Sequence, residues 1–551
     1  MESLHTSIIP HSSGWTFAMI TLPLLVPLLF LSLLLLFILE RYLTYRKLCQ
    51  KYSHLPGYTQ FCPPVVASWL PSFLLPHGTL TNPTGYFLME KIKQSMKEFK
   101  TDYYKVIIFT TPMVVISNPE MGKEISLKGT KMYRKKPHSK RSFIELFKGS
   151  NVFAEDEHAA WAHQRHLIEP GFSPESLKMV SHVTSECIQQ EMIPHLNANL
   201  EKRDVMSDFA KLTMNVIGSA GFSYNFDSFC MTAQSQNLEQ KTNFFLHYID
   251  TLRLLPTRFL RQHLKVGLFA KLHDSVQSFR KVILDIIQHR EQQDENGQEE
   301  DDKSDILSLL LRERKISGKQ GGGSLTDSEL VSNAFILLVA GHETTARTLG
   351  FALYLLCKNP HIQQELHHFV DRFCEENQKE TFDYEDFTSG RLDYLKAVFK
   401  ETLRLYPVAM GVIRECVKSF EWKKQNIPKG SLVFYSWIMS MSSEEYWEEP
   451  EQFKPIRFLK KENNHHDEKD PTKGTVYNPQ SNPFVYTPFG IGGRICIGKH
   501  FAEVEGIIAL AYLARNYSFK LSDPNYQLEV DMRVTLRPME PILVDFIPRR
   551  R

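Results

Sequence analysis

The chain has 551 residues, 42% of them hydrophobic, and a formal net charge of only +2. This composition is typical of a protein that buries a large core, and so small a charge excludes a general electrostatic affinity for nucleic acid. The eight cysteines contain no CxxC pair, so we expect neither a disulfide framework nor a zinc site, and the cysteines suit a reducing compartment.

The first predicted element is apolar. Residues 15–39 contain no charged side chain, and about 20 such residues cross a bilayer as a helix. No Lys or Arg precedes the run, which argues against a cleaved signal peptide, and we prefer a permanent anchor to a buried core helix. Arg41 and Lys47 follow it, so the positive-inside rule places the remainder in the cytosol. We expect a non-cytosolic tail over 1–14, a transmembrane anchor over 15–39, a basic linker over 40–54 and one catalytic domain over 55–551.

Short strands and long helices follow. The β-branched segment 105–118 predicts two strands around a turn at Thr111 and Pro112. Most of the chain from Pro119 to about Cys416 has a helical pattern, including an apolar, aromatic stretch over 244–269. We therefore expect a mainly α fold with small β-sheets (α+β).

One predicted helix carries a locally weak segment. Thr326 and Glu329 fit a capping box at its start, and residues 340–345 (AGHETT) combine a glycine with two β-branched threonines. A threonine hydroxyl that bonds to a carbonyl one turn earlier bends a helix and opens space for a small ligand. A bend without a chemical role fits the segment equally well. A zinc-protease HExxH motif is excluded, because Ala346 stands where the second histidine is needed.

A glycine-rich loop over 489–498 (FGIGGRICIG) contains one cysteine. The glycines let backbone approach a flat macrocycle, and Arg494 offers a fork of donors to a propionate. Cys496 precedes a helix predicted over 499–517, whose dipole favours a thiolate. A buried structural cysteine is the alternative, but a chance match at five positions is expected on the order of once in ten thousand chains. The loop therefore predicts a thiolate ligand of haem iron.

This loop resembles the haem-binding loop of the cytochrome P-450 superfamily, the haem-thiolate monooxygenases. The family pattern is matched at five positions, although Gly493 stands where many members have proline. The matched residues are Phe489, Gly492, Arg494, Cys496 and Gly498. The apolar N-terminus resembles that of the membrane-anchored eukaryotic microsomal type. The resemblance covers residues from about 55 to the end and implies the cytochrome P-450 fold, preceded here by one transmembrane helix.

The resemblance also implies the cofactor and its ligands. The cofactor would be haem b, with Cys496 as the axial thiolate and Phe489 in the haem loop. Arg494 would bind a propionate, and Trp161 and Arg165 resemble the family's W-x-x-x-R pair with the same role, for which cation–π packing is the alternative. Arg414 is a weaker candidate for a propionate.

Three further motifs resemble those of the family. In AGHETT, Thr344 would hold the hydrogen-bond chain that delivers protons to dioxygen, and Glu343 would relay them from solvent. Glu401, Arg404 and Arg457 resemble the E-x-x-R and F-x-P-x-R-F elements, which imply a buried charge triad that fixes the core beneath the haem.

The implied activity is the insertion of one oxygen atom from O2 into a lipophilic substrate. No strand-flanked GxGxxG is present, so the electrons would come from a separate NADPH–cytochrome P-450 reductase at the endoplasmic reticulum membrane, with the catalytic domain facing the cytosol. The region 244–269 would cover the active site, or else form a plain pair of core helices. The alternatives are a haem-thiolate isomerase or dehydratase acting on hydroperoxides, whose members typically lack the Glu-Thr pair, and a non-enzymatic haem sensor.

Overall fold

The structure of the protein is a computed structural model, and its described residues form two compact units. One unit spans Met1–Pro83 and Tyr104–Val114, and the other spans Thr84–Tyr103 and Val115–Arg551. The described residues are 13–62, 85–128, 132–135, 147–230, 241, 244–245, 266–295, 305–320, 325–459, 482–532 and 534–549.

The first unit contains helix α1 (Ser13–Lys51), which continues through most of the segment predicted as a basic linker. Strand β1 (Gly57–Gln60) pairs in parallel with β2 (Tyr103–Ile108), so that Gly57 lies opposite Lys105. The buried Lys105 donates from Nζ to the Tyr52 carbonyl at 2.7 Å, which ties β2 to the segment that follows α1. Within the described part of the chain, no helix combines the length and the apolar character needed to cross a membrane.

The turn between β2 and β3 (Thr111–Ile116) lies two residues earlier than predicted. Phe109 takes the left-handed conformation, with φ of 57°, that such a turn requires. Thr111 and Pro112 instead begin β3. The prediction of a turn there was wrong because proline is also tolerated near the start of a strand, where its missing N–H costs little.

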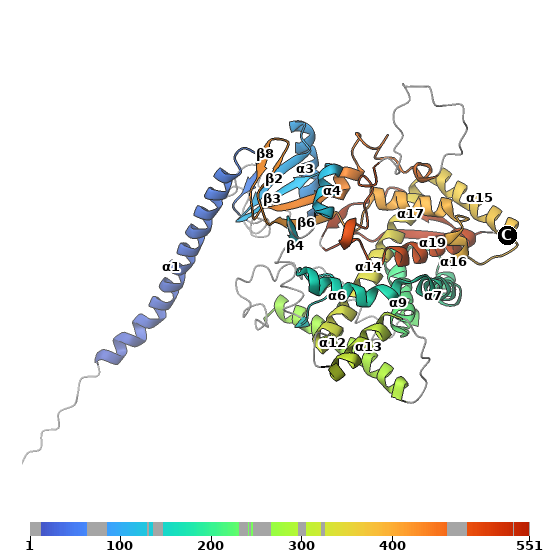
Figure 1. Cartoon of the computed structure of the whole chain (residues 1–551), viewed down its shortest axis with the longest axis horizontal. Helices are drawn as coiled ribbons and strands as arrows, with labels where there is room; N and C mark the ends of the chain where they lie inside the picture. Colours follow the sequence, from blue (N-terminus) through green and yellow to red (C-terminus); the bar gives the residue numbers. More distant parts are fainter. Residues whose placement is uncertain are drawn as a thin grey trace, which may run out of the picture. The chain divides into compact units, whose positions relative to one another are not determined.

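The second unit is mainly helical, as predicted from the sequence (Figure 1). Its α-helices with described bounds are α3 (Gly85–Phe99), α4 (Pro119–Leu127), α6 (His158–Ile168), α7 (Pro174–Glu186), α8 (Ile193–Ala198), α9 (Val205–Phe222), α12 (Leu268–Glu295), α13 (Ile306–Gln320), α14 (Asp327–Lys358), α15 (Pro360–Asn377), α16 (Tyr384–Thr388), α17 (Asp393–Leu405), α18 (Trp437–Met441) and α19 (Lys499–Asn516). The predicted helix after Cys496 is confirmed as α19.

Small antiparallel sheets complete this unit. Strand β6 pairs with β9 on one side and β4 on the other, β13 pairs with β10 and β5, and β7–β8 and β11–β12 are two-stranded. The strands are β4 (Tyr133–Lys135), β5 (Arg203–Asp204), β6 (Gly411–Cys416), β7 (Phe420–Trp422), β8 (Gln425–Ile427), β9 (Leu432–Ser436), β10 (Tyr517–Leu521), β11 (Val530–Met532), β12 (Leu536–Pro538) and β13 (Leu543–Pro548).

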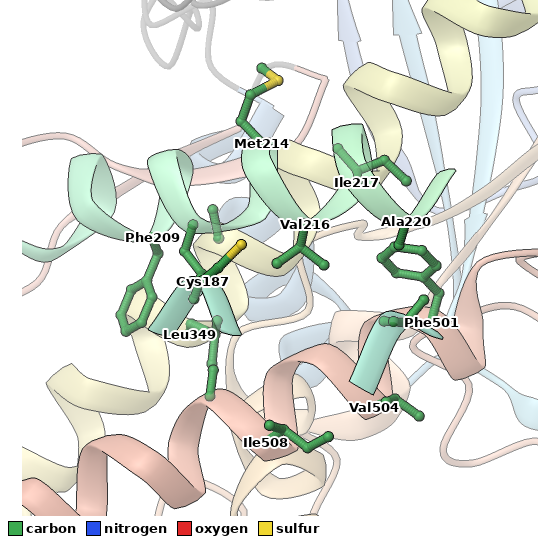
Figure 2. Close-up of a cluster of buried hydrophobic side chains, with 14 of the residues drawn as sticks. Cys187, Phe209, Met214, Val216, Ile217, Ala220, Leu349, Phe501, Val504 and Ile508 are labelled. Carbon is green, nitrogen blue, oxygen red and sulfur yellow. The ribbon is translucent and has the colours of Figure 1, made fainter. Parts of the chain in front are cut away.

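The core of the second unit lies between α7, α9, α14 and α19, which pack on one another. Figure 2 shows Phe209 and Val216 of α9 on one side of this layer and Val504 and Ile508 of α19 on the other, with Leu349 of α14 among them. All five side chains are buried, and each contributes about 1.5–3 kcal/mol by leaving water. The packing of these buried side chains therefore holds both α14 and α19 in place.

The start of α14 follows the sequence prediction. The Thr326 hydroxyl accepts the Glu329 N–H at 3.2 Å, and the Glu329 carboxylate accepts the Thr326 N–H at 3.0 Å. This capping box satisfies two of the backbone donors that a helix leaves open at its first turn.

The predicted charge triad is also present, and it joins α17 to the segment around Pro455. Arg404 donates two hydrogen bonds to the Glu401 carboxylate at 2.8 and 2.9 Å, and Arg457 donates a third at 3.2 Å. The side chains of Glu401 and Arg404 are wholly buried, and Arg404 also donates to the Met441 and Gln452 carbonyls. The triad thus connects three segments that are distant in the sequence.

We predict that Arg404→Leu lowers the free energy of unfolding by about 3–5 kcal/mol, because the buried Glu401 carboxylate loses its main partner. The urea midpoint measures the loss. Lys97→Met is the control, since Lys97 and Glu444 form an ion pair of 3.2 Å whose side chains are 63% and 75% exposed. That variant is expected to change stability by about 0–1 kcal/mol, and equal losses in the two variants would contradict the structural role of the triad.

Candidate active site

Backbone geometry shapes the loop that carries Cys496. The Cys496 N–H donates to the Phe489 carbonyl at 2.9 Å, and the Ile495 N–H donates to the Gly492 carbonyl at 3.0 Å. Gly492 has φ of 76°, and a Cβ there would lie 2.7 Å from the Ser126 carbonyl oxygen, so only glycine fits. The loop ends at Gly498, the N-cap of α19. Phe489 is half-buried and packs against the core, so the loop is fixed at both ends.

The Cys496 side chain is exposed to solvent, yet protein surrounds the sulfur closely enough to raise the pKa of the thiol. Desolvation is the main cause. The Gly498 N–H and the positive charges of Arg165 and Lys499 lower the pKa but do not compensate. The free thiol is therefore protonated at neutral pH, and a metal ion is needed to hold it as thiolate.

Arg494, Trp161 and Arg165 lie together beside this loop. The Arg494 guanidinium carbon lies 4.0 Å from the centre of the Trp161 ring, and that of Arg165 lies 5.9 Å from it. Arg165 donates to the Ile495 carbonyl at 2.8 Å, and Arg494 donates to the Glu155 carbonyl at 2.8 Å. Cation–π packing thus occurs, mainly through Arg494, and Arg165 links α6 directly to the residue before Cys496.

Arg414 joins the same group, together with a lysine that the sequence analysis missed. Lys135 of β4 lies opposite Arg414 of β6. Burial and the nearby charges of Arg494 and Arg414 lower the pKa of Lys135 to about 7, and burial with Arg414 lowers that of Arg494 to about 10. No motif contains Lys135, and only its register opposite Arg414 reveals it.

These four cations, Lys135, Arg165, Arg414 and Arg494, form what we call the basic cluster. Among the described residues, no carboxylate pairs with any of them within ion-pair distance. Besides burial, the neighbouring positive charges lower the pKa values of Lys135 and Arg494, and an anion would relieve this repulsion. A ligand with two carboxylates, such as haem with its propionates, fits the basic cluster, and the exposed residue Cys496 lies beside it.

Helix α14 presents one accessible face. Its residues from 330 to 356 are buried except Ala340, Gly341, Thr344 and Arg347, which recur at helical spacing. The Thr344 hydroxyl donates to the Ala340 carbonyl at 2.8 Å, which confirms the predicted bond to the preceding turn, while the helix stays continuous. Thr344 is therefore partly accessible, with a hydroxyl whose lone pairs remain available.

Glu343 lies in a different environment from its neighbour Thr344. It is only 6% exposed, and its carboxylate pairs with Arg347 one turn later on α14. The pKa of Glu343 is raised overall, chiefly by burial, although the charge of Arg347, a hydrogen bond from Thr535 and the charge of Arg537 lower it. Glu343 thus combines burial with nearby cations, as expected for a group that exchanges protons.

The structure therefore brings the predicted site residues together in two groups. The first group is the loop over 489–498, which carries Arg494 and Cys496, together with the side chains beside it. These are Trp161, Arg165 and Arg414. Thr344 and Glu343 lie on α14, which packs against α19. Within the described part of the chain, no three His, Cys, Asp or Glu side chains gather to hold a metal ion by themselves.

Comparison with known proteins identifies the family. The family model for Cytochrome P450 matches residues 76–546. The chain belongs to the cytochrome P450 family. Cytochrome P450 3A6 of the rabbit is 29% identical over 451 residues, which cover 80% of this chain and 83% of the relative. Human cytochrome P450 3A5 is 29% identical over 415 residues, which cover 73% of this chain and 76% of the relative.

Membership of the P450 family confirms several predictions at once. The fold is the P450 fold, mainly helical with small sheets, and the protein is a monooxygenase. Its cofactor is haem with a cysteine thiolate ligand. The basic cluster and the exposed thiol of Cys496 are consistent with that cofactor.

One buried acid of this P450 was not noticed in the sequence. Glu505 of α19 is wholly buried, and its carboxyl faces the hydroxyl of Thr345, the neighbour of Thr344 on α14. Burial raises the pKa of Glu505 well above its ordinary value, which favours the protonated, neutral carboxyl at the contact between the two helices. This contact links the helix that carries Thr344 to the helix that follows Cys496.

We predict that Glu505→Gln removes a pH dependence of stability in this P450. The folded chain keeps a proton that the unfolded chain releases above about pH 4.3, so the free energy of unfolding falls by up to about 1.4 kcal/mol per pH unit until the raised pKa is passed. The difference in Tm between the variant and the parent should therefore be more positive at pH 8 than at pH 5.

Thermal unfolding at the two pH values measures this difference. Glu376→Gln, at an exposed position of α15, is the control and should show the same Tm difference at both. A pH-independent offset for Glu505→Gln would contradict the neutral state of Glu505.

Proposed function

We propose that this P450 binds haem through Cys496 and hydroxylates a lipophilic substrate with electrons from a separate NADPH-dependent reductase. The observation that carries the proposal is an exposed cysteine residue beside a basic cluster that lacks carboxylate partners among the described residues. Arg494, Arg165, Arg414 and Lys135 would neutralise the two propionates. Trp161, stacked on Arg494, would contribute the donor of its indole ring.

The loop around Cys496 would tune the ligand. The Gly498 N–H hydrogen-bonds the sulfur and stabilises its negative charge. Bound haem supplies the redox-active iron that activates dioxygen, and a thiolate ligand favours cleavage of the O–O bond, as is known for this family. Phe489 fixes the other end of the loop through its carbonyl and its packing against the core.

Thr344 and Glu343 would deliver the protons. The Thr344 hydroxyl, on the accessible face of α14, donates to dioxygen and is reprotonated in turn. Glu343 takes protons from solvent, a role supported by the opposing effects of burial and Arg347 on its pKa. This acid and alcohol pair favours oxygen activation over the alternative, a haem-thiolate isomerase or dehydratase.

We further propose that residues 15–39 anchor the protein in the endoplasmic reticulum membrane, with the catalytic domain in the cytosol. The side chains of α1 are described from residue 31 onward, and the apolar ones at Leu33, Leu36 and Leu39 are 52–61% exposed. An exposed apolar helix followed by Arg41 is what a membrane anchor requires. The anchor also supports a lipophilic substrate such as a fatty acid or sterol.

Part of the apolar, aromatic region 244–269 also supports an apolar substrate. Its residues 246–265 lie outside the described residues. Phe245 is buried, and its ring lies 5.5 Å from that of Phe335 on α14 and 6.1 Å from those of Phe147 and Phe279. This aromatic group places apolar side chains over the first half of α14, upstream of Thr344.

The activity is tested with purified protein, NADPH–cytochrome P450 reductase and a panel of fatty acids and sterols. We expect NADPH-dependent consumption of O2 and a hydroxylated product. Turnover of hydroperoxides without NADPH would instead support the isomerase or dehydratase, and no turnover of either kind would support a sensor.

We predict that Cys496→Ala abolishes the thiolate-type absorption spectrum of the reduced carbonyl complex, because the sulfur ligand is lost. Cys374→Ala, a buried cysteine of α15 away from the loop, is the control and should keep the parental spectrum. A thiolate-type spectrum in Cys496→Ala would exclude Cys496 as the ligand.

We predict that Thr344→Ala retains haem but releases hydrogen peroxide, since the hydroxyl that passes protons to dioxygen is gone. General acid catalysis of this kind contributes about 10²–10⁴-fold, so product formed per O2 should fall at least about tenfold. Peroxide, product and O2 are measured together. Thr348→Ala, one turn later and buried, should stay coupled, and tight coupling in Thr344→Ala would contradict the assigned role.

A further inference from the structure

A hairpin near the C-terminus contacts α14 beside Glu343. Strands β11 and β12 pair so that Asp531 lies opposite Arg537 and Met532 opposite Leu536. The Leu536 N–H donates to the Val408 carbonyl at 2.8 Å, which holds the hairpin to the segment after α17. The hairpin is therefore fixed independently of its contacts with α14.

Arg347 joins Glu343 to this hairpin. Its guanidinium pairs with the Glu343 carboxylate, hydrogen-bonds the Thr535 hydroxyl and donates to the Leu536 carbonyl at 3.1 Å. The Arg347 side chain is 13% exposed and that of Glu343 is 8% exposed. The carboxylate on α14 is thus bound to a cation whose Nη1 atom donates to the hairpin.

Other charges surround the pair. Arg537 donates to Asp531 at 3.2 Å, and its positive charge also acts on Glu343. Besides burial, the charges of Glu343, Arg537 and Asp531 act on the pKa of Arg347. Burial lowers the pKa of the neighbouring His342 on α14, and the charge of Arg347 lowers it further. One acid and one guanidinium group therefore lie on α14, and one of each lies on the hairpin.

An exposed pair of Glu and Arg one turn apart on a helix would add only about a few tenths of a kcal/mol to stability and would not fix the position of either side chain. This pair is different, because both groups are largely removed from water and Arg347 is anchored at its far side. Removing Arg347 would leave a buried carboxylate that takes up a proton instead of staying ionised. Whether the Glu343 carboxyl is ionised therefore depends on the hairpin as well as on α14.

We propose that Arg347, held by the β11–β12 hairpin, is a positioning residue that keeps Glu343 ionised and fixed until it accepts a proton from solvent. Protonation cancels the charge that binds Glu343 to Arg347, and the released carboxyl then passes the same proton to the Thr344 hydroxyl, which donates its own to dioxygen. Glu343 returns to the ionised, paired state. This inference rests on the roles proposed for Glu343 and Thr344.

The first test detects the proton itself, by infrared spectroscopy of the purified resting holoprotein. Arg347→Met should show the C=O stretch of a protonated carboxylic acid, absent from the parent at pH 7 and from the double variant Arg347→Met, Glu343→Gln. Arg347→Lys keeps the positive charge and should resemble the parent. No new band in Arg347→Met, or one that persists in the double variant, would overturn the inference.

The second test measures product formed per O2. We expect Arg347→Met to lower this ratio about tenfold, less than the roughly 10²–10⁴-fold of a general acid itself because Arg347 acts only through Glu343, and to leave haem content and the substrate-binding spectrum unchanged. Thr535→Val, which removes the hydroxyl that bonds both Arg347 and Glu343 but leaves the Leu536 carbonyl to hold Arg347, should lower the ratio in the same direction by less. Parental coupling in both variants would overturn the inference.

Arg203→Met is the matched control. Arg203 is also 13% exposed and pairs with Asp208 at 2.6 Å, but it lies on β5. It should keep the parental ratio, and a loss equal to that of Arg347→Met would show that removing any buried arginine has this effect. If Thr344→Ala and Glu343→Gln stay coupled, the proposed function fails, whereas loss of coupling in these two but not in Arg347→Met overturns this inference alone.

Discussion

The arrangement depends on one electrostatic constraint, the cost of holding a negatively charged sulfur among protein atoms. Desolvation raises the pKa of the Cys496 thiol, and the Gly498 N–H and the charge of Arg165 only partly offset it. A thiolate at this position therefore requires a metal cation. The neighbouring basic cluster has the opposite requirement, since its like charges need an anion. Haem satisfies both, because its iron is a cation and its propionates are anions.

On helix α14, too, a buried charged group has a partner of opposite charge, here in the residues proposed to transfer protons. Most of the helix is buried in the core against α9 and α19, which holds it in place. Thr344 lies on the narrow accessible face, while Glu343 is turned into the protein and paired with Arg347. Adjacent residues on a helix point about 100° apart, so one helix can present an alcohol to open space and keep an acid beside the β11–β12 hairpin. The proton path we propose runs between these two environments.

Several features followed from local sequence. The capping box at Thr326 and Glu329, the bond from Thr344 to Ala340 and the helix after Cys496 each depend on residues within one or two turns. The triad of Glu401, Arg404 and Arg457 spans more of the chain, and it was predicted only through the resemblance to a family. The misplaced turn between β2 and β3 shows the limit of local rules, because Pro112 suits both a turn and the start of a strand.

The sequence by itself therefore determined the family, the haem-thiolate chemistry and the helix that carries Thr344, because the residues concerned are close together or occur in fixed motifs. Only the tertiary structure showed that Lys135 joins Arg414, that Glu505 faces Thr345 and that Arg347 is held by Thr535. Each of these contacts joins segments whose separation in the chain carries no pattern. They form because strands pair in register and helices pack through their buried faces, and both depend on the folded core as a whole.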